Sequence, residues 1–157
     1  MTRSTPNRSR HLPAVVRALK AMAHPARLRM LAMLASGELC VCQITAVLEL
    51  AASTVSGHLA DLRAAGLVTE QRQGKWVRYR LTEDPDILGL IRSALAPLGA
   101  DDQTGADAAV VRHVRRIPVE TLSGAGLDVA AITAANRACC PPKSSSRRAR
   151  AVQTTGL

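Results

Sequence analysis

Two close pairs of cysteines are the residues of this chain whose type and spacing best suit chemistry. The chain has 157 residues but only four cysteines. Cys40 and Cys42 flank a single valine in the stretch ELCVCQI, and Cys139 and Cys140 are adjacent in NRACCPP. Thiolates bind soft, thiophilic ions, and paired thiols can also be oxidised to a disulfide. The two pairs therefore indicate either ion capture or a redox switch.

The composition limits the class of protein that carries these pairs. With one Trp, one Tyr and no Phe, the core must be built from aliphatic residues and Met, which favours helices. No apolar run is long enough to span a bilayer, and the N-terminal MTRSTPNRSR lacks the apolar middle of a secretory signal. We therefore expect a cytoplasmic protein, without a membrane segment, in which paired cysteines bind metal or sense redox more often than they form structural disulfides.

The net charge of +9 is concentrated at the two ends of the chain. Residues 1–10 hold three Arg, residues 143–150 hold one Lys and three Arg, and neither stretch contains an acid. Basic arms of this kind strengthen binding to a polyanion such as DNA without reading its sequence. Solvated, disordered tails explain either arm equally well when it is taken alone.

Apolar spacing predicts a chain of helices interrupted by one hairpin. In the hairpin, Val77, Tyr79 and Leu81 alternate with Trp76, Arg78 and Arg80, which is typical of a strand with one apolar and one largely basic face. Gly74 supplies the turn that joins it to the strand before. Helices are expected over residues 12–23, 25–37, 42–50, 53–66, 84–99, 106–116 and 127–138.

The helix over residues 53–66 carries the most information. Ser53 is expected to cap it, Gly66 to end it, and Val55, Leu59 and Leu62 to face the core. Its opposite face then presents small polar groups. A short helix, a turn, this helix and a basic hairpin form the pattern of a winged helix-turn-helix. We predict a mainly α fold with a two-stranded wing, dimeric, and with a helical C-terminal extension.

The expected division of the chain follows from these elements. It comprises a basic flexible arm (1–11), a winged helix-turn-helix domain for DNA binding and dimerisation (12–100), a helical extension ending in the adjacent cysteines (101–140) and a basic disordered tail (141–157).

From about Leu12 to Ser93 the sequence resembles the ArsR/SmtB family of metal- and metalloid-responsive repressors. The resemblance rests on the order and spacing of AMAHPARLRML, GELCVCQI, STVSGHLADLRAAGLV and QGKWVRYRL. It implies a homodimer joined by the first and last core helices, bound to a palindromic operator in double-stranded DNA. It also implies that effector binding relieves repression.

Within the resemblance, ELCVC is the part that points to sensing of arsenite, antimonite, cadmium or lead, and it assigns ligand roles to Cys40 and Cys42. Side chains at i and i+2 point to nearly opposite sides of an ideal helix. Both thiolates can therefore hold one ion only if the helix begins, or unwinds, between them. We expect ion binding to strain the start of a helix that positions the DNA-reading helix.

The third ligand departs from the family pattern. In one branch a third cysteine follows three residues after the second, and here that position is Thr45. Cys139 and Cys140 are the only remaining thiols, and they can complete the site within one subunit or across the dimer. Four thiolates would suit Cd(II), Pb(II) or Zn(II). The adjacent pair can instead be a separate trap for a trivalent metalloid, or incidental.

By resemblance and by helical geometry, hydroxyl and imidazole groups of the 53–66 helix enter the major groove, while basic residues there and on the hairpin contact phosphates or the minor groove. Gly57 replaces the basic or amide side chain that the family often carries there. The residues expected to contact DNA are Ser53, Thr54, Ser56, His58, Arg63, Arg72, Lys75 and Arg78.

Two other functions compete with ion sensing. A thiol-redox-switched regulator fits the same cysteine pairs, and nothing in the sequence excludes it. An enzyme such as a thiol-dependent arsenate reductase needs a phosphate-cradling loop after its cysteine, and Cys140 is followed by two prolines that lack N–H donors.

We therefore predict a non-enzymatic homodimeric repressor with no small organic substrate. It is expected to leave operator DNA when As(III) or Sb(III) binds the cysteine thiolates, with the Cd(II), Pb(II) or Zn(II) sensor and the redox switch as alternatives.

Overall fold

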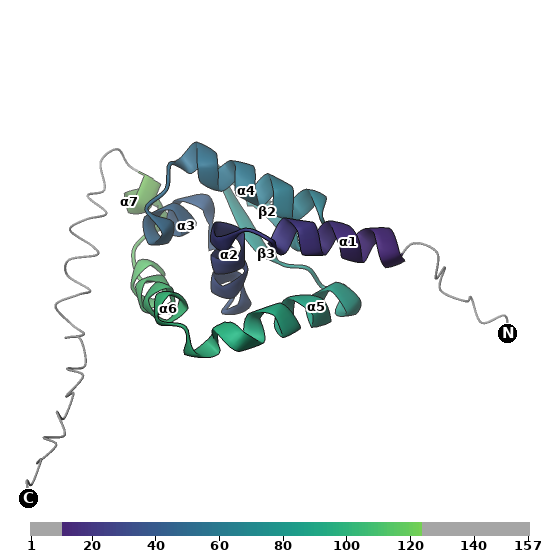
Figure 1. Ribbon diagram of the computed structural model, residues 1–157. Helices are drawn as coiled ribbons and strands as arrows, with labels where there is room; N and C mark the ends of the chain where they lie inside the picture. Colours follow the sequence, from purple (N-terminus) through teal and green to yellow (C-terminus); the bar gives the residue numbers. More distant parts are fainter. Residues whose placement is uncertain (1–10, 124–157) are drawn as a thin grey trace, which may run out of the picture.

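The computed structural model describes residues 11–123, and seven α-helices surround a small sheet in that part of the chain (Figure 1). In chain order the elements are α1 (His11–Met22), α2 (Pro25–Ala35), β1 (Leu39–Cys40), α3 (Val41–Leu48), α4 (Ala52–Ala64), β2 (Val68–Gln73), β3 (Trp76–Leu81), α5 (Pro85–Leu95), the 3-10 helix η2 (Ala96–Ala100), α6 (Asp102–Val114) and α7 (Val119–Ser123).

Helix α2 occupies the centre of the molecule, with α4 on one side of it and α5 on the other (Figure 1). Its start is fixed locally, because His24 Nδ1 accepts a hydrogen bond of 3.2 Å from the backbone N–H of Ala26 and Pro25 occupies the first turn. Aliphatic and Met side chains from α2, α3, α4 and α5 fill the core. The largest fully buried ones on these helices include Met30, Leu31, Ile44, Leu59, Leu62 and Ile91.

Helices α6 and α7 add to this same core. Val111, Val114 and Leu122 are buried in it, and both helices contact α3. In Figure 1 α3, α6 and α7 lie together at one end of the molecule. Helices α6 and α7 therefore pack against α3, the helix that begins at the first cysteine pair.

The sheet has three antiparallel strands in the order β1-β3-β2. The β2–β3 hairpin is the predicted wing, and its turn passes through Gly74 at φ +59°, a left-handed conformation that favours glycine. The third strand, β1, was not expected. It places Leu39 opposite Tyr79 and Cys40 opposite Arg78, so β3 is the central strand. On its basic face Arg78 is half-buried, whereas Arg80 is exposed.

The mainly helical winged helix-turn-helix with a β-wing is confirmed, whereas several predicted helix ends are wrong. Helix α4 begins at Ala52 rather than behind a Ser53 cap, because the carbonyl of Ala51 already accepts the Val55 N–H at 3.0 Å. Helix α3 begins at Val41 and ends where Glu49 turns left-handed at φ 55°.

The predictions after the wing also need correction. The helix expected over 106–116 begins at Asp102, because the Asp101 side chain accepts the Thr104 N–H at 2.9 Å and caps it there. The stretch expected to separate two helices contains α7. The helix predicted over 127–138 lies outside the described residues.

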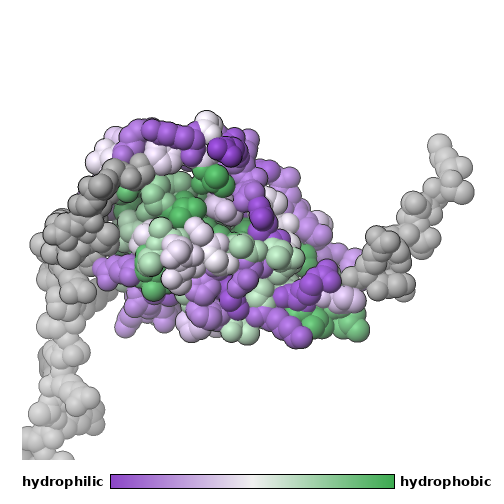
Figure 2. Space-filling view, turned by 90° about the horizontal axis from the view of Figure 1, so that it is seen from above, coloured by the Kyte–Doolittle hydropathy of each residue, from purple (hydrophilic) through white to green (hydrophobic). Residues whose placement is uncertain are grey.

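An apolar stripe on α1 lies open to solvent. Leu12, Val16 and Leu19 are 73%, 38% and 49% exposed, and their i, i+4, i+7 spacing puts them on one face. Ala18 and Met22 of the same helix are buried in the core. Figure 2 shows hydrophobic residues at the surface beside the start of the grey N-terminal trace, where α1 lies. Within residues 11–123, no helix combines the length and apolar character that crossing a membrane requires.

One ion pair ties α6 to α2. Arg29 donates from Nε and Nη2 to the two carboxylate oxygens of Asp107 at 2.7 and 2.8 Å, and Gln103 donates to the same carboxylate at 3.0 Å. The Asp107 side chain is only 6% exposed. Its hydrogen bond is the main reason that the pKa of Arg29 is raised above its usual value.

Replacing Asp107→Ala is expected to lower the free energy of unfolding by about 2 kcal/mol, because it leaves a partly buried guanidinium without its partner. Urea unfolding followed by circular dichroism measures the change. Asp102→Asn, on the exposed start of the same helix, is the control and should change stability by less than about 0.5 kcal/mol. Equal effects of the two substitutions would contradict this role for the ion pair.

Candidate functional site

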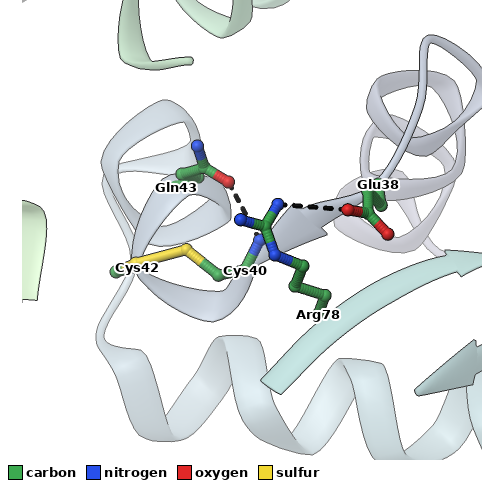
Figure 3. The surroundings of a disulfide bond; sticks show 5 residues. All are labelled: Glu38, Cys40, Cys42, Gln43 and Arg78. Carbon is green, nitrogen blue, oxygen red and sulfur yellow. Dashed lines mark hydrogen bonds and ion pairs between the residues drawn. A yellow bond between two sulfur atoms is a disulfide. The ribbon is translucent and has the colours of Figure 1, made fainter. Parts of the chain in front are cut away.

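The first cysteine pair lies where β1 ends and α3 begins. Cys40 is the residue before the helix, with the extended values φ −87° and ψ 164°, and Cys42 belongs to the first helical turn. Because the helix starts between them, the side chains converge: their Cα atoms are 5.5 Å apart and their sulfurs are joined in a disulfide (Figure 3). The geometric condition that the sequence imposed on a shared ion, a helix start at this point, is therefore present.

The segment around this pair is held from two sides. Gln43 is buried, and its Oε1 accepts the Cys40 N–H at 3.0 Å. On the neighbouring strand Arg78 forms an ion pair of 3.2 Å with Glu38 (Figure 3). Cys40 itself is 2% exposed, whereas Cys42 is half-buried. An incoming ion or reagent would therefore meet Cys42 first.

Thr45 lies three residues after Cys42, at the position of the third cysteine in one branch of the resembled family. Its hydroxyl is the one buried side-chain polar atom of the described residues that lacks a hydrogen-bond partner. Within residues 11–123 no three His, Cys, Asp or Glu side chains gather into a metal site. In the reduced form the cysteine pair would offer two soft donors, so an ion site of three donors would need one from outside the described residues or from a second subunit.

Cys139 and Cys140 lie outside the described residues. The described chain ends at Ser123 in α7, which contacts α3, sixteen residues before Cys139. At about 3.3 Å per extended residue, those sixteen span up to roughly 50 Å. Chain length alone therefore does not separate the terminal cysteines from the Cys40–Cys42 pair of the same subunit.

Helix α4 shows the predicted separation of faces. Val55, Leu59 and Leu62 are fully buried, while Ser53, Thr54 and Ser56 are exposed. These three hydroxyls, called the hydroxyl row below, lie in the first turns of the helix and are open to solvent.

His58 differs from the hydroxyl residues because its ring turns back toward α2. The ring centroid lies 4.5 Å from that of His24, at an interplanar angle of 47°. Burial, followed by the nearby His24 and Arg27, lowers the pKa of His58 below its usual value. Arg27 in turn pairs with Asp61 of α4 at 3.1 Å. His58 is thus half-buried and favours the neutral form.

The basic residues predicted to contact DNA fall into two groups. Arg72 and Lys75 lie at the exposed wing tip, where Arg72 Nε donates to the Gly74 carbonyl at 3.3 Å and the Lys75 ammonium lies 4.9 Å from the centre of the Trp76 ring. Arg63 and Arg78 are instead paired with acids of the protein itself.

Arg63 forms an ion pair with Glu70. The same carboxylate accepts a hydrogen bond of 3.1 Å from the Tyr79 hydroxyl, and burial together with that bond raises the pKa of Tyr79. These internal pairs, and the contacts of Gln43 and Glu38, were missed by the sequence analysis. A signal existed for Gln43 alone, because Gln three residues after a helix cap is part of a known capping pattern.

Comparison with known proteins adds to this geometry. The model of the family described as bacterial regulatory protein, arsR family, matches residues 24–70. The arsenic resistance transcriptional regulator ArsR1 of Pseudomonas putida is 49% identical over 63 residues, which cover 40% of this chain and 49% of that protein. The chain thus spans about half the length of this curated relative.

Two further proteins are matched over a larger share of their own length. The arsenic resistance transcriptional regulator ArsR2 of Pseudomonas putida is 38% identical over 93 residues, 58% of this chain and 79% of that protein. A solution structure of a homodimeric winged helix-turn-helix DNA-binding domain from Mycobacterium bovis has a TM-score of 0.52 and 29% identity, over 64% of this chain and 94% of that one.

The position of His58 predicts a pH dependence of stability. A histidine whose pKa is lowered by folding binds its proton more readily when unfolded, so stability falls as the pH drops through the ordinary value near 6.5. Between about pH 7.5 and pH 5.5, the melting temperature of His58→Gln should fall by about 2 °C less than that of the unaltered protein. His113→Gln, at an exposed position of α6, is the control, and its melting temperature should fall by the same amount as that of the unaltered protein.

Proposed function

The chain belongs to the arsR family of bacterial regulatory proteins, and from that premise we propose that it is a homodimeric repressor that binds operator DNA and releases it when As(III) or Sb(III) binds its cysteine thiolates. The family consists of transcription regulators, so the protein is not an enzyme. The observation that carries the choice of effector is the convergence of Cys40 and Cys42 at the start of α3.

The exposed stripe of α1 supports a dimer. Leu12, Val16 and Leu19 lose contact with water only if another surface covers them, and burial of such a stripe is a strong driving force for association. The similar Mycobacterium bovis domain is a homodimer. A second copy of this chain is therefore the proposed partner of this face.

The row of hydroxyls on α4 supports DNA recognition. In a helix-turn-helix the second helix enters the major groove with its first residues nearest the bases, and here those residues are Ser53, Thr54 and Ser56. The wing-tip residues Arg72 and Lys75 are placed for phosphate or minor-groove contacts. Arg63 and Arg78 would serve DNA only if they exchange their carboxylate partners for phosphates.

Replacing Thr54→Ala should weaken operator binding without affecting stability. A hydrogen bond to DNA lost in each half-site costs about 1 kcal/mol, so affinity of the dimer should fall about thirty-fold. Fluorescence anisotropy with the DNA upstream of the gene measures it. Ser93→Ala, on α5 at the far side of the molecule in Figure 1, is the control. A Thr54→Ala protein with unchanged affinity would remove this residue from the proposed interface.

The proposed release starts at the boundary between β1 and α3. Cys40 and Cys42 would supply two thiolates, and Cys139 or Cys140, of the same or the partner chain, the third. As(III) and Sb(III) prefer such soft donors, and a fourth thiolate would instead favour Cd(II), Pb(II) or Zn(II). Because α3 contacts α4, a change in the first turn of α3 acts on the helix that bears the hydroxyl row.

The test is titration of the reduced dimer on its own upstream DNA with arsenite and, in parallel, with cadmium. Arsenite should release the DNA, and Cys40→Ser and Cys42→Ser should each shift the midpoint of release at least tenfold, as expected when one of two or three ligands is lost. The double variant Cys139→Ser/Cys140→Ser should do the same if the terminal pair completes the site. A full arsenite response in Cys40→Ser and Cys42→Ser would refute the proposal.

A redox switch is the second candidate, because the sulfurs of Cys40 and Cys42 are joined in the structure. In that case peroxide in metal-free buffer should weaken DNA binding, and a reductant should restore it. The loss should occur in the Cys139→Ser/Cys140→Ser protein and be absent in Cys42→Ser. Equal DNA affinity of the dithiol and disulfide forms would exclude this function.

A further inference from the structure

A basic groove beside the cysteine pair is not used by the proposed repressor mechanism. Its volume is about 460 Å³, within the range of small-molecule sites, and it lies between the start of α3, strand β3 and the turn that joins α6 to α7. The residues that line it are Glu38, Gln43, Arg78, Arg115, Arg116, Ile117, Pro118 and Val119. We propose that this groove binds a small, multiply charged oxyanion, a carboxylate- or phosphate-bearing molecule.

The charge of the lining favours an anion. The lining contains three guanidinium groups and a single carboxylate, that of Glu38. This carboxylate is already paired with Arg78. Among the described residues, the side chain of Arg116 forms no ion pair or hydrogen bond. A guanidinium presents five N–H donors in a plane, which matches the paired oxygens of a carboxylate or a phosphate.

Part of this donor set is held in place before any ligand arrives. Arg115 Nη1 donates to the Ser36 carbonyl at 2.9 Å, and a Cβ on Gly37 would lie only 3.1 Å from its Nη2, so the guanidinium packs directly against the chain there. Gln43 is 5% exposed and uses its Oε1 for the Cys40 N–H. Its amide nitrogen points away from Cys40 in Figure 3 and remains available as a donor. Donors fixed in this way bind with less loss of entropy.

The dimensions and the rest of the sequence favour a small molecule over a segment of the chain itself. Residues 124–157 contain a single acid, Asp128, against one Lys and four Arg, so this stretch has the wrong charge for an arginine-lined groove. Ile117, Pro118 and Val119 add an apolar wall, which suits an organic anion better than a bare ion. The binding would not depend on the effector proposed for the cysteines.

Isothermal titration calorimetry of the full-length dimer in about 150 mM salt tests the proposal, with citrate and inorganic phosphate as separate probes and glycerol as the neutral control. One saturable site per subunit is expected, with a Kd of about 1 mM or below. Saturation by citrate alone identifies carboxylates as the ligand chemistry, and saturation by phosphate alone identifies phosphates.

Two matched variants locate the site. Arg116→Gln should weaken binding at least tenfold, whereas Arg112→Gln, which removes the same charge from an exposed position of α6 outside the groove, should change it less than twofold. Equal weakening by both, or no saturable binding of either anion, would overturn the proposal. If instead neither anion binds and Arg116→Gln alone weakens operator binding, the groove contacts DNA phosphate and the small-anion site is refuted.

Discussion

The point at which strand β1 becomes helix α3 is the constraint on which the chemistry of this protein depends. Cys40 ends the strand, where it pairs with β3 opposite Arg78, and it is also the residue that immediately precedes the helix. If the helix began one turn earlier, the Cys40 and Cys42 side chains would diverge by the ordinary geometry of a helix and their sulfurs could not meet. Pairing with a strand that comes from residues 76–81, and the Gln43 hydrogen bond, fix that boundary.

The same boundary is a suitable place for a switch because of what α3 contacts. Helix α3 contacts α4, which bears the hydroxyl row, and it also contacts α6 and α7. Ile44, Val47 and Leu48 bury its inner face, so little free space is left in which a displaced first turn can be absorbed. A change at the cysteines is therefore expected to act on the elements that α3 contacts. Among these, α4 carries the exposed hydroxyls of the proposed DNA interface.

Local patterns predicted the wing and the described helices other than α7, but not the contacts between distant segments. Val55, Leu59 and Leu62 could be assigned to the core from spacing alone, since helical periodicity decides which face is buried. Strand β1 has two residues and shows no periodicity. The ion pairs Glu38–Arg78 and Arg29–Asp107 join residues that are 40 and 78 positions apart, so no local signal exists for them. These ion pairs determine which arginine side chains have no carboxylate partner within the described residues.

Two of the arginines expected to contact DNA are already paired with carboxylates of the protein, which limits the charge available for phosphate contacts. Arg63 and Arg78 are neutralised by Glu70 and Glu38, and the exposed start of α4 presents hydroxyls rather than charges. In the proposed complex the start of α4 would therefore contribute hydrogen bonds that need accurate placement, while Arg72 and Lys75 of the wing would supply the attraction to phosphate. Such bonds are lost when a helix shifts by a fraction of a hydrogen-bond length. In the proposed mechanism, a displacement of α4 that follows from a change in the first turn of α3 would break such bonds and so weaken operator binding.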